Sequence, residues 1–458
     1  MNLLHSSRGR VPVLALLLGL GQAAAPAPAL AKTLPFEIKT VTLENGLRLV
    51  MVPYASPGLI AYYTMVRVGS RDEVEPGVTG FAHFFEHMMF RGTPTHTPEV
   101  VSAYLKKTGA DQNGFTTDDF TCYTFFGRSD YLEELVRMEA DRFQNLAYSE
   151  DVFKTESKAV LGEYNKSASS PWLKLEERLR ELTFQRHTYG HTTLGYLADI
   201  EAMPTRYAYS KTFFSRYYTP DNSTVVAVGD FDPVVLEALV RREYGGWKTK
   251  RATSDVKPEP PQTKALSDRL AWKTPTLPML SMSWRTPATR YAKPTEARET
   301  AVFQVLFELL FGEVSPAYTE LVLEQQLVDR FSDGGSASRD PGLFHVVALV
   351  KDVQHVSKVQ QRMDQAVAEL AAGKLTAERL AAVKSRVRYG LLLRLSSPSS
   401  VADTLVFSIA PTGEVDALEK LLAAIEAVQP GDVRAFVQKY LTPKNRAVIT
   451  LAHEEASR

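Results

Sequence analysis

The chain has 458 residues, of which 44% are hydrophobic and 23% charged, and its 53 Lys and Arg residues balance its 53 Asp and Glu residues. This is the composition of a folded protein, and it lacks the basic excess typical of nucleic-acid binding, so no nucleic-acid partner is predicted. A chain of this length exceeds one ordinary hydrophobic core, and we expect at least two domains.

Residues 1–31 have the order of segments found in a secretory signal peptide. Two arginines precede the apolar run 11–20, and small residues follow as far as Ala31. We predict cleavage before Lys32 and export across the inner membrane, to the periplasm. An uncleaved anchor is the alternative, but the apolar run is shorter than the roughly 20 residues of a spanning helix. We therefore expect no stable membrane span after cleavage.

Hydrophobic periodicity predicts mixed strands and helices in the first half. Asn45 and Gly46 suit a tight hairpin turn between strands near 41–43 and 47–52, and another strand is expected at 60–68. Helical patterns follow at 78–90, 98–107, 131–146 and 154–166, with an alternating strand at 120–126. The absence of regular βαβ alternation indicates an α+β fold.

The polar, proline-containing segment 248–264 has no apolar periodicity and is interpreted as an interdomain linker. The parts on either side share a short repeat, because YYTPDN at 217–222 is echoed by YLTPKN at 440–445. Each copy joins a helical stretch to a β-rich run, which favours a duplicated domain. We therefore predict one domain at 32–247 and a homologous domain at 265–458.

A metal-binding pattern lies within the segment GFAHFFEHMMF. His83 and His87 are four residues apart, so a helix would place both imidazoles on one face, within reach of one cation. Zinc suits this pair, and Glu86 is the predicted general base. The alternative, two core histidines and a surface carboxylate, would leave three polar groups without partners in an apolar segment. His-x-x-Glu-His is the inverted zincin motif.

With this motif the chain resembles the pitrilysin-like (inverzincin, M16) zinc metallopeptidase family, specifically two-domain members similar to the mitochondrial processing peptidase β subunit. The match covers nearly the whole mature chain and is strongest over 43–165. It implies two homologous α/β-roll domains, each a mixed sheet with helices packed on it. It also implies a zinc-dependent endopeptidase with one zinc ion per chain, held by the first domain, that hydrolyses peptides or unfolded segments. The signal-like segment 1–31 predicts that this endopeptidase is secreted.

The resemblance also implies the remaining residues of the metal site. The third ligand in the family is a Glu about 75 residues beyond the second His, and Glu163 lies 76 residues after His87. Glu156, two helical turns earlier in the string TESKAVLGE, matches the family's Glu that supports the site from the outer shell. Spacing alone would not distinguish Glu163 from other carboxylates on a helix surface.

Segment 109–126 resembles the family's edge strand, which pairs with an extended substrate beside the zinc. Asn113 would then bond the peptide near the scissile bond, and main-chain pairing suits broad specificity because every sequence supplies it. An internal strand, in which Asn113 only ends a turn, is the alternative, and Gly114 replaces the Ala common in the family. Six other histidines are expected to be structural or exposed: His96, His187, His191, His345, His355 and His453.

The second domain lacks a pair of residues that the resemblance leads us to expect. Family members active as single chains or homodimers carry an Arg there and a Tyr seven residues later, which stabilise the oxyanion. Val322 and Asp329 occupy these positions here. This implies a heterodimer with a related zinc-free subunit that carries the pair, although a shifted alignment that recruits Arg330 leaves a homodimer open. A catalytically silent assembly or binding subunit is the alternative function, against which the complete motif argues.

Overall fold

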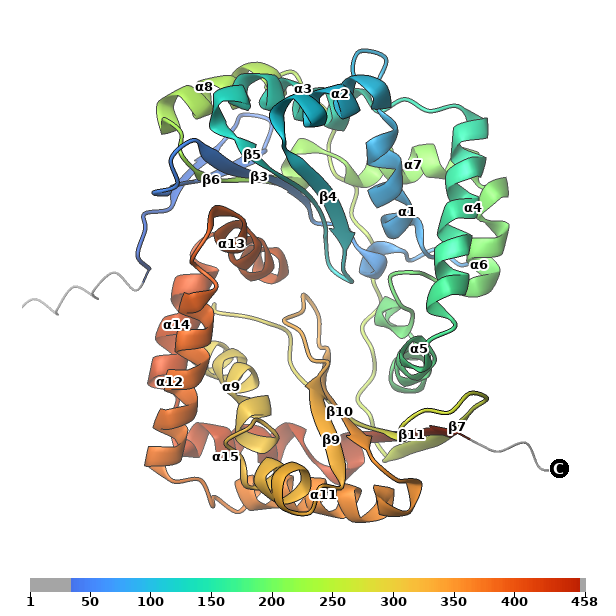
Figure 1. Ribbon diagram of the computed structural model, residues 1–458, viewed down its shortest axis with the longest axis vertical. Helices are drawn as coiled ribbons and strands as arrows, with labels where there is room; N and C mark the ends of the chain where they lie inside the picture. The colour runs from blue at the N-terminus through green and yellow to red at the C-terminus, as the bar shows by residue number, and fades with distance from the viewer. Residues whose placement is uncertain (1–33, 454–458) are drawn as a thin grey trace, which may run out of the picture. The chain divides into compact units, whose positions relative to one another are not determined.

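The computed structural model describes residues 34–453, so the predicted signal peptide lies outside the described residues. The described chain contains two mixed sheets with helices packed on each of them (Figure 1). The expected α+β fold is therefore confirmed. No helix in this range is long and apolar enough to cross a membrane.

The first sheet has six strands in the order β1–β2–β6–β3–β5–β4. Its strands are β1 (Lys39–Thr42), β2 (Arg48–Pro53), β3 (Leu59–Val66), β4 (Asp111–Thr116), β5 (Thr121–Arg128) and β6 (Ser223–Gly229). Only the β2–β6 pair is parallel. The hairpin predicted at Asn45 and Gly46 is confirmed, since β1 and β2 pair and Gly46 has φ 93°, which favours glycine.

The second sheet repeats the connectivity of the first. Its strands are β7 (Leu266–Trp272), β8 (Met279–Arg285), β9 (Val328–Asp333), β10 (Leu343–Val350) and β11 (Arg446–His453), in the order β7–β11–β8–β10–β9. The pair β11–β7 is parallel and the others are antiparallel, as in the series β2–β6–β3–β5–β4. The predicted duplication is thus visible in the order and direction of the strands.

The short sequence repeat has a structural reason. In both copies a helix ends at a tyrosine, a one-turn 3-10 helix follows, and the chain then enters the inner strand of its sheet: α7 (Tyr207–Tyr217) leads to β6, and α15 (Pro430–Tyr440) leads to β11. Asn222 Nδ2 donates to the carbonyl of Tyr217 at 2.8 Å, and Asn445 Nδ2 donates to that of Tyr440 at 2.6 Å. The asparagine therefore closes the same turn twice.

The other helices of the first half are α1 (Phe81–Met88), α2 (Pro98–Thr108), α3 (Leu132–Asn145), α4 (Glu150–Ser167), α5 (Pro171–Thr183), α6 (Leu197–Ala202) and α8 (Pro233–Tyr244). Those expected from periodicity are present with shifted ends. The α1 helix begins at Phe81 because Gly80 has φ 88°, outside the helical region. The α4 helix begins at Glu150 because the hydroxyl of Ser149 caps it, accepting from the amide of Val152.

The second half contributes α9 (Pro294–Leu310), α10 (Pro316–Tyr318), a π-helical turn η7 (Thr319–Glu324), α11 (Val356–Ala371), α12 (Ala377–Leu393), α13 (Pro398–Thr412) and α14 (Ala417–Ala427). The segment 248–264 contains neither helix nor strand. The single cysteine, Cys122, is buried in β5.

Two helices each pack against the sheet of the other half of the chain. The α13 helix packs against the first sheet, where Leu405 and Ile409 share a buried cluster with Val226 (Figure 1). The α5 helix packs against the second sheet, where Leu175 and Leu179 lie among apolar residues of its strands. Each sheet is therefore covered in part by a helix from the other half, and the two cores depend on one another.

A set of ion pairs, which we call the clasp, joins the β9–β10 loop to the first half. The side chain of Arg339 is almost fully buried, and its guanidinium lies 3.2 Å from Asp72 Oδ2. Its backbone amide donates to Asp119 Oδ2 at 2.8 Å. The neighbouring Asp340 lies 2.5 Å from the guanidinium of Arg71 and 3.1 Å from His187 Nε2. His187 is structural, as expected.

We expect Arg339→Met to lower the free energy of unfolding by about 3 kcal/mol, because it leaves the buried carboxylate of Asp72 without its cationic partner in the β9–β10 loop. Arg330→Met is the matched control, since Arg330 lies on β9 with 59% of its side chain exposed and should change stability by less than about 0.5 kcal/mol. Chemical denaturation of both variants measures the difference. Equal midpoints for the two would contradict a structural role for the clasp.

Candidate metal centre

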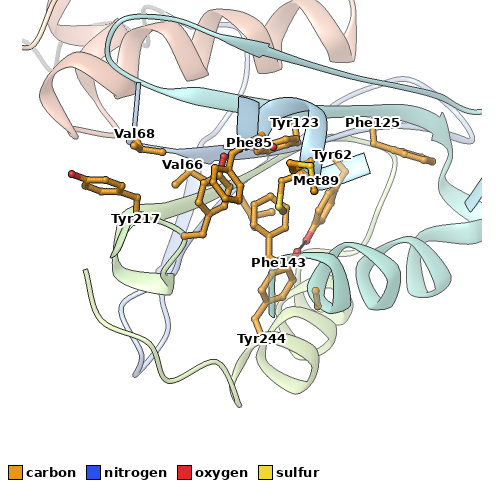
Figure 2. Close-up of a cluster of buried hydrophobic side chains, with 14 of the residues drawn as sticks. Tyr62, Val66, Val68, Phe85, Met89, Tyr123, Phe125, Phe143, Tyr217 and Tyr244 are labelled. Carbon is orange, nitrogen blue, oxygen red and sulfur yellow. Dashed lines mark hydrogen bonds between the residues drawn. The ribbon is translucent and has the colours of Figure 1, made fainter. Parts of the chain in front are cut away.

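The α1 helix has two faces with different surroundings. Its Phe and Met side chains are fully buried, and Phe85 stacks on Phe213 with ring centroids 5.4 Å apart. Figure 2 shows Phe85 among the aromatic side chains of the first core, including Tyr123 and Phe143. This burial fixes the rotation of the helix about its axis. His83, Glu86 and His87 consequently share the other face.

The amino end of α1 is held by carboxylates from outside the helix. Gly80, at the N-cap, has no side chain that could accept from the first amides, and the buried carboxylate of Glu73 replaces it. Glu73 accepts from the amides of Gly80 at 2.8 Å and Ala82 at 2.7 Å. Asp199 accepts from the amide and hydroxyl of Thr79. Burial raises the pKa of Glu73 to about 8. No pattern in the sequence predicts this role of Glu73.

The structure brings His83, His87 and Glu163 together. Glu163, on α4, places Oε2 3.6 Å from Nε2 of His83 and 3.3 Å from Nε2 of His87. One ligand atom from each residue lies within 4.8 Å of the others, and no other group of three His, Cys, Asp or Glu in residues 34–453 meets this condition. Zinc ligands about 2.1 Å from the metal in tetrahedral geometry are about 3.4 Å apart. The spacing therefore fits a zinc ion.

The protonation of His83 also fits a metal ligand. The residue is 7% exposed, and burial, together with the neighbouring His87, lowers its pKa to about 4. Neutral imidazole is the form that binds zinc. Glu163 is 44% exposed at its side chain, so the group opens to solvent on the side of α4. A catalytic zinc site needs such an opening for water and substrate.

Glu156 lies beside the group and does not join it. It is buried, and its Oε2 is 3.6 Å from Nδ1 of His87, the ring nitrogen that does not face Glu163. Its other oxygen is 2.5 Å from the guanidinium of Arg91. Burial alone would raise the pKa of Glu156, but His87 and Arg91 outweigh burial and lower it. The role of Glu156 in supporting the metal site from the outer shell stays a prediction.

Glu86 points towards the edge strand of the first sheet. Its Oε2 accepts from the hydroxyl of Thr116, on β4, at 2.6 Å. Burial raises the pKa of Glu86, and the bond from Thr116 opposes this effect. A Cβ added at Gly114 would lie 3.0 Å from Cγ of Glu86, so the glycine gives the carboxylate room. The resemblance places segment 109–126 beside the zinc, but no pattern in the sequence predicts the bond between Thr116 and Glu86.

Asn113 lies on β4, which is the last strand of the sheet and leaves one edge unpaired within the described residues. The internal-strand alternative is therefore wrong. The Asn113 side chain is exposed, and its Oδ1 accepts from the amide of Gly114 at 2.9 Å. A role in substrate binding remains a prediction.

The two positions at which the resemblance leads us to expect an Arg and a Tyr lie in the second half. Val322 is in the π-helical turn, while Asp329 and Arg330 are exposed on β9, the edge strand of the second sheet, 3.4 Å from one another. Gln326 lies between Val322 and Asp329 in the sequence. Its φ of 52° is the only positive value among the described residues other than glycine. Within residues 34–453, no hydrogen bond or ion pair joins Arg330 to the candidate centre.

Family models match most of the chain. One, described as Insulinase (Peptidase family M16), covers residues 61–196, and another, described as Peptidase M16 inactive domain, covers residues 207–387. The chain is 28% identical over 438 residues to an uncharacterized zinc protease of Mycobacterium tuberculosis, covering 93% of this chain and 95% of the relative. It is 23% identical over 426 residues to a probable mitochondrial-processing peptidase subunit beta of Schizosaccharomyces pombe, covering 90% of each.

Solved structures share the fold. A protease from Helicobacter pylori matches with a TM-score of 0.83 and 24% identity, over 91% of this chain and 99% of that chain. A peptidase M16 inactive domain from Pseudomonas fluorescens matches with a TM-score of 0.79 and 15% identity, over 92% and 99%. The first half of the periplasmic protease PqqL from Escherichia coli matches with a TM-score of 0.71 and 18% identity, over 91% and 92%.

We expect Glu163→Gln to weaken zinc retention, because it removes a negatively charged ligand and leaves two imidazoles. Glu150→Gln is the matched control, since Glu150 is exposed in the first turn of the same helix and pairs with Lys154. Zinc loss to a chelator, followed by metal analysis, should be faster for Glu163→Gln than for the control. Equal rates would mean that the third ligand is a different residue.

Proposed function

Because this chain belongs to the peptidase M16 family, we propose that it is a zinc-dependent endopeptidase that hydrolyses peptides or unfolded segments. The observation that carries the proposal is the convergence of His83, His87 and Glu163, with Glu86 on the same face of α1. Three protein ligands and an opening to solvent are features of a catalytic zinc site rather than a closed structural one.

In this proposal His83, His87 and Glu163 hold one zinc ion per chain. Zinc bound there would supply Lewis-acid polarisation of the scissile carbonyl. Glu86 accepts a proton from the attacking water and passes it to the leaving amine, and the hydroxyl of Thr116 holds its carboxylate in place. Glu156 keeps the ring of His87 oriented.

The unpaired edge of β4 supports the substrate class. An extended peptide can add to such an edge through main-chain hydrogen bonds, which every sequence supplies. Thr116, at the end of β4, is bonded to Glu86, so a peptide on this edge would lie beside the proposed base. Asn113 is the residue proposed to bond the peptide near the scissile bond.

We further propose the division into a catalytic domain at 32–247 and a homologous non-catalytic domain at 265–458, joined by 248–264. Each of the two longer ranges contains one complete sheet, which supports this division. Export to the periplasm is proposed from the signal-like segment 1–31, and the fold shared with the first half of the periplasmic protease PqqL is compatible with it.

Glu86→Gln should retain about one zinc ion per chain and lose peptide hydrolysis by a factor of about 100 to 10 000, because it removes the proton acceptor without removing a ligand. Glu134→Gln, at an exposed position on α3, is the matched control and should keep full activity. Metal analysis and cleavage of an unfolded protein substrate measure both properties. Hydrolysis at the unsubstituted rate by the zinc-loaded Glu86→Gln variant would refute the assigned role.

The lack of the Arg and Tyr pair leads us to propose a heterodimer with a related zinc-free subunit that carries it. Without oxyanion donors, the isolated chain should be slower by about 100-fold or more. The chain is assayed alone and after mixing with such a subunit, and activity should appear on mixing and disappear when the partner's Arg is removed. Full activity of the pure chain would contradict the heterodimer and favour a homodimer, whereas inactivity in both assays would favour the silent-subunit alternative.

A further inference from the structure

A cavity of the described chain lies between the end of β4 and the second half. Its volume is about 870 Å³, and its walls include residues of the β4–β5 turn, of α5, of the β9–β10 loop and of α13. It is large enough to enclose several side chains of a peptide. The proposed hydrolytic chemistry does not use the residues of this cavity.

Three aromatic rings form one part of the cavity wall. Phe115, from β4, and Phe407, from α13, are stacked with their centroids 5.5 Å apart and their planes 3° from parallel. Phe120 meets Phe407 edge-on at 5.3 Å and Phe115 at 5.8 Å. Phe120 is buried, but Phe407 is 51% exposed. We call these three residues the aromatic wall. It leaves apolar surface uncovered inside a cavity.

Residues on the two faces of β4 have different neighbours. Gly114 and Thr116 face Glu86, whereas Phe115, between them, faces α13. In a strand added to the free edge of β4, a residue opposite Phe115 would point to the same face as Phe115, and its neighbours would point to the other face. A bound peptide would therefore present alternate side chains to the aromatic wall and to the catalytic face.

We infer that the aromatic wall is a subsite that selects an apolar or aromatic side chain of a peptide bound along β4, at the position opposite Phe115. The inference rests on the proposed peptidase function for the presence of that peptide. The occupant is argued from the exposed ring of Phe407, from the free edge of β4, and from the continuity of that edge with Glu86 through Thr116.

A basic side chain is the competing occupant of the cavity. Asp333 and Asp403 line it, and neither has a cationic partner within 4.0 Å among the described residues, so the test includes a cationic peptide. Asp403 is partly buried and Asp333 is more exposed, and desolvation raises the pKa of each. The rings, in contrast, lie directly at β4, where the proposed strand pairing positions the side chain. The geometry therefore favours the apolar occupant.

The test measures binding rather than turnover, so that it does not depend on a partner subunit. The probes are three fluorescein-labelled ten-residue peptides, each rich in serine, with Phe, Ala or Lys at alternate positions. They are titrated against the zinc-loaded full chain carrying Glu86→Gln, and fluorescence anisotropy reports the affinity. The Phe peptide should bind about tenfold or more tightly than the Ala peptide, which is the discrimination expected of an apolar pocket.

Adding Phe407→Ala should remove most of this preference while leaving the affinity for the Ala peptide unchanged. Leu393→Ala is the matched control, since Leu393 is highly exposed on α12 and does not line the cavity. Phe115→Leu keeps an apolar side chain and should reduce the preference less than Phe407→Ala. Circular dichroism and unfolding midpoints confirm that each variant is folded.

Three results would contradict the proposed subsite. They are equal affinity for the Phe and Ala peptides, tighter binding of the Lys peptide than of the Phe peptide, and a preference for the Phe peptide that persists in the folded Phe407→Ala variant. Failure of the proposed function would look different. It would be the absence of zinc-dependent hydrolysis by the unsubstituted chain, alone and with a partner subunit, whatever the peptide preference of the Glu86→Gln variant.

Discussion

The burial of the aromatic face of α1 is the interaction on which the candidate site depends. Phe85 and its neighbours fix the rotation of the helix about its axis, so that both imidazoles face α4 and Glu86 faces β4. Glu73 fixes the start of the helix by accepting from its first amides. A buried imidazole such as that of His83 is costly without a partner, and binding of a cation would remove that cost.

Two contacts of the clasp connect the second half to segments that hold α1 and Glu86. Asp72, which pairs with Arg339, directly precedes Glu73, the carboxylate that caps α1. Asp119, which accepts from the amide of Arg339, lies in the turn that follows Thr116, the residue that holds Glu86. The exchanged helices α5 and α13 add apolar contacts between the halves. The segments at both ends of the candidate site thus contact the second half, although that half supplies none of the proposed ligands.

Local patterns in the sequence were enough to predict the elements that carry the site. The spacing of His83 and His87 on an apolar helix predicted their shared face, and the six-residue repeat predicted the duplicated topology because one asparagine closes the same turn twice. Glu163 required the family resemblance, since an exposed carboxylate on a helix has no distinguishing neighbours in sequence. Glu73, Thr116, the clasp and the aromatic wall could not be predicted, because each depends on contacts between segments far apart in the chain. The helix α5 was also not predicted, and its apolar face is directed to the sheet of the other half.

Zinc binding by His83, His87 and Glu163 is the central proposal for this protein. The most direct measurement is the zinc content of the purified, folded chain without its first 31 residues, compared with that of His87→Ala. We predict close to one zinc ion per chain for the unsubstituted protein and almost none for His87→Ala. A folded, unsubstituted protein that holds no zinc after incubation with the metal, or one that holds it equally well without His87, would contradict the account.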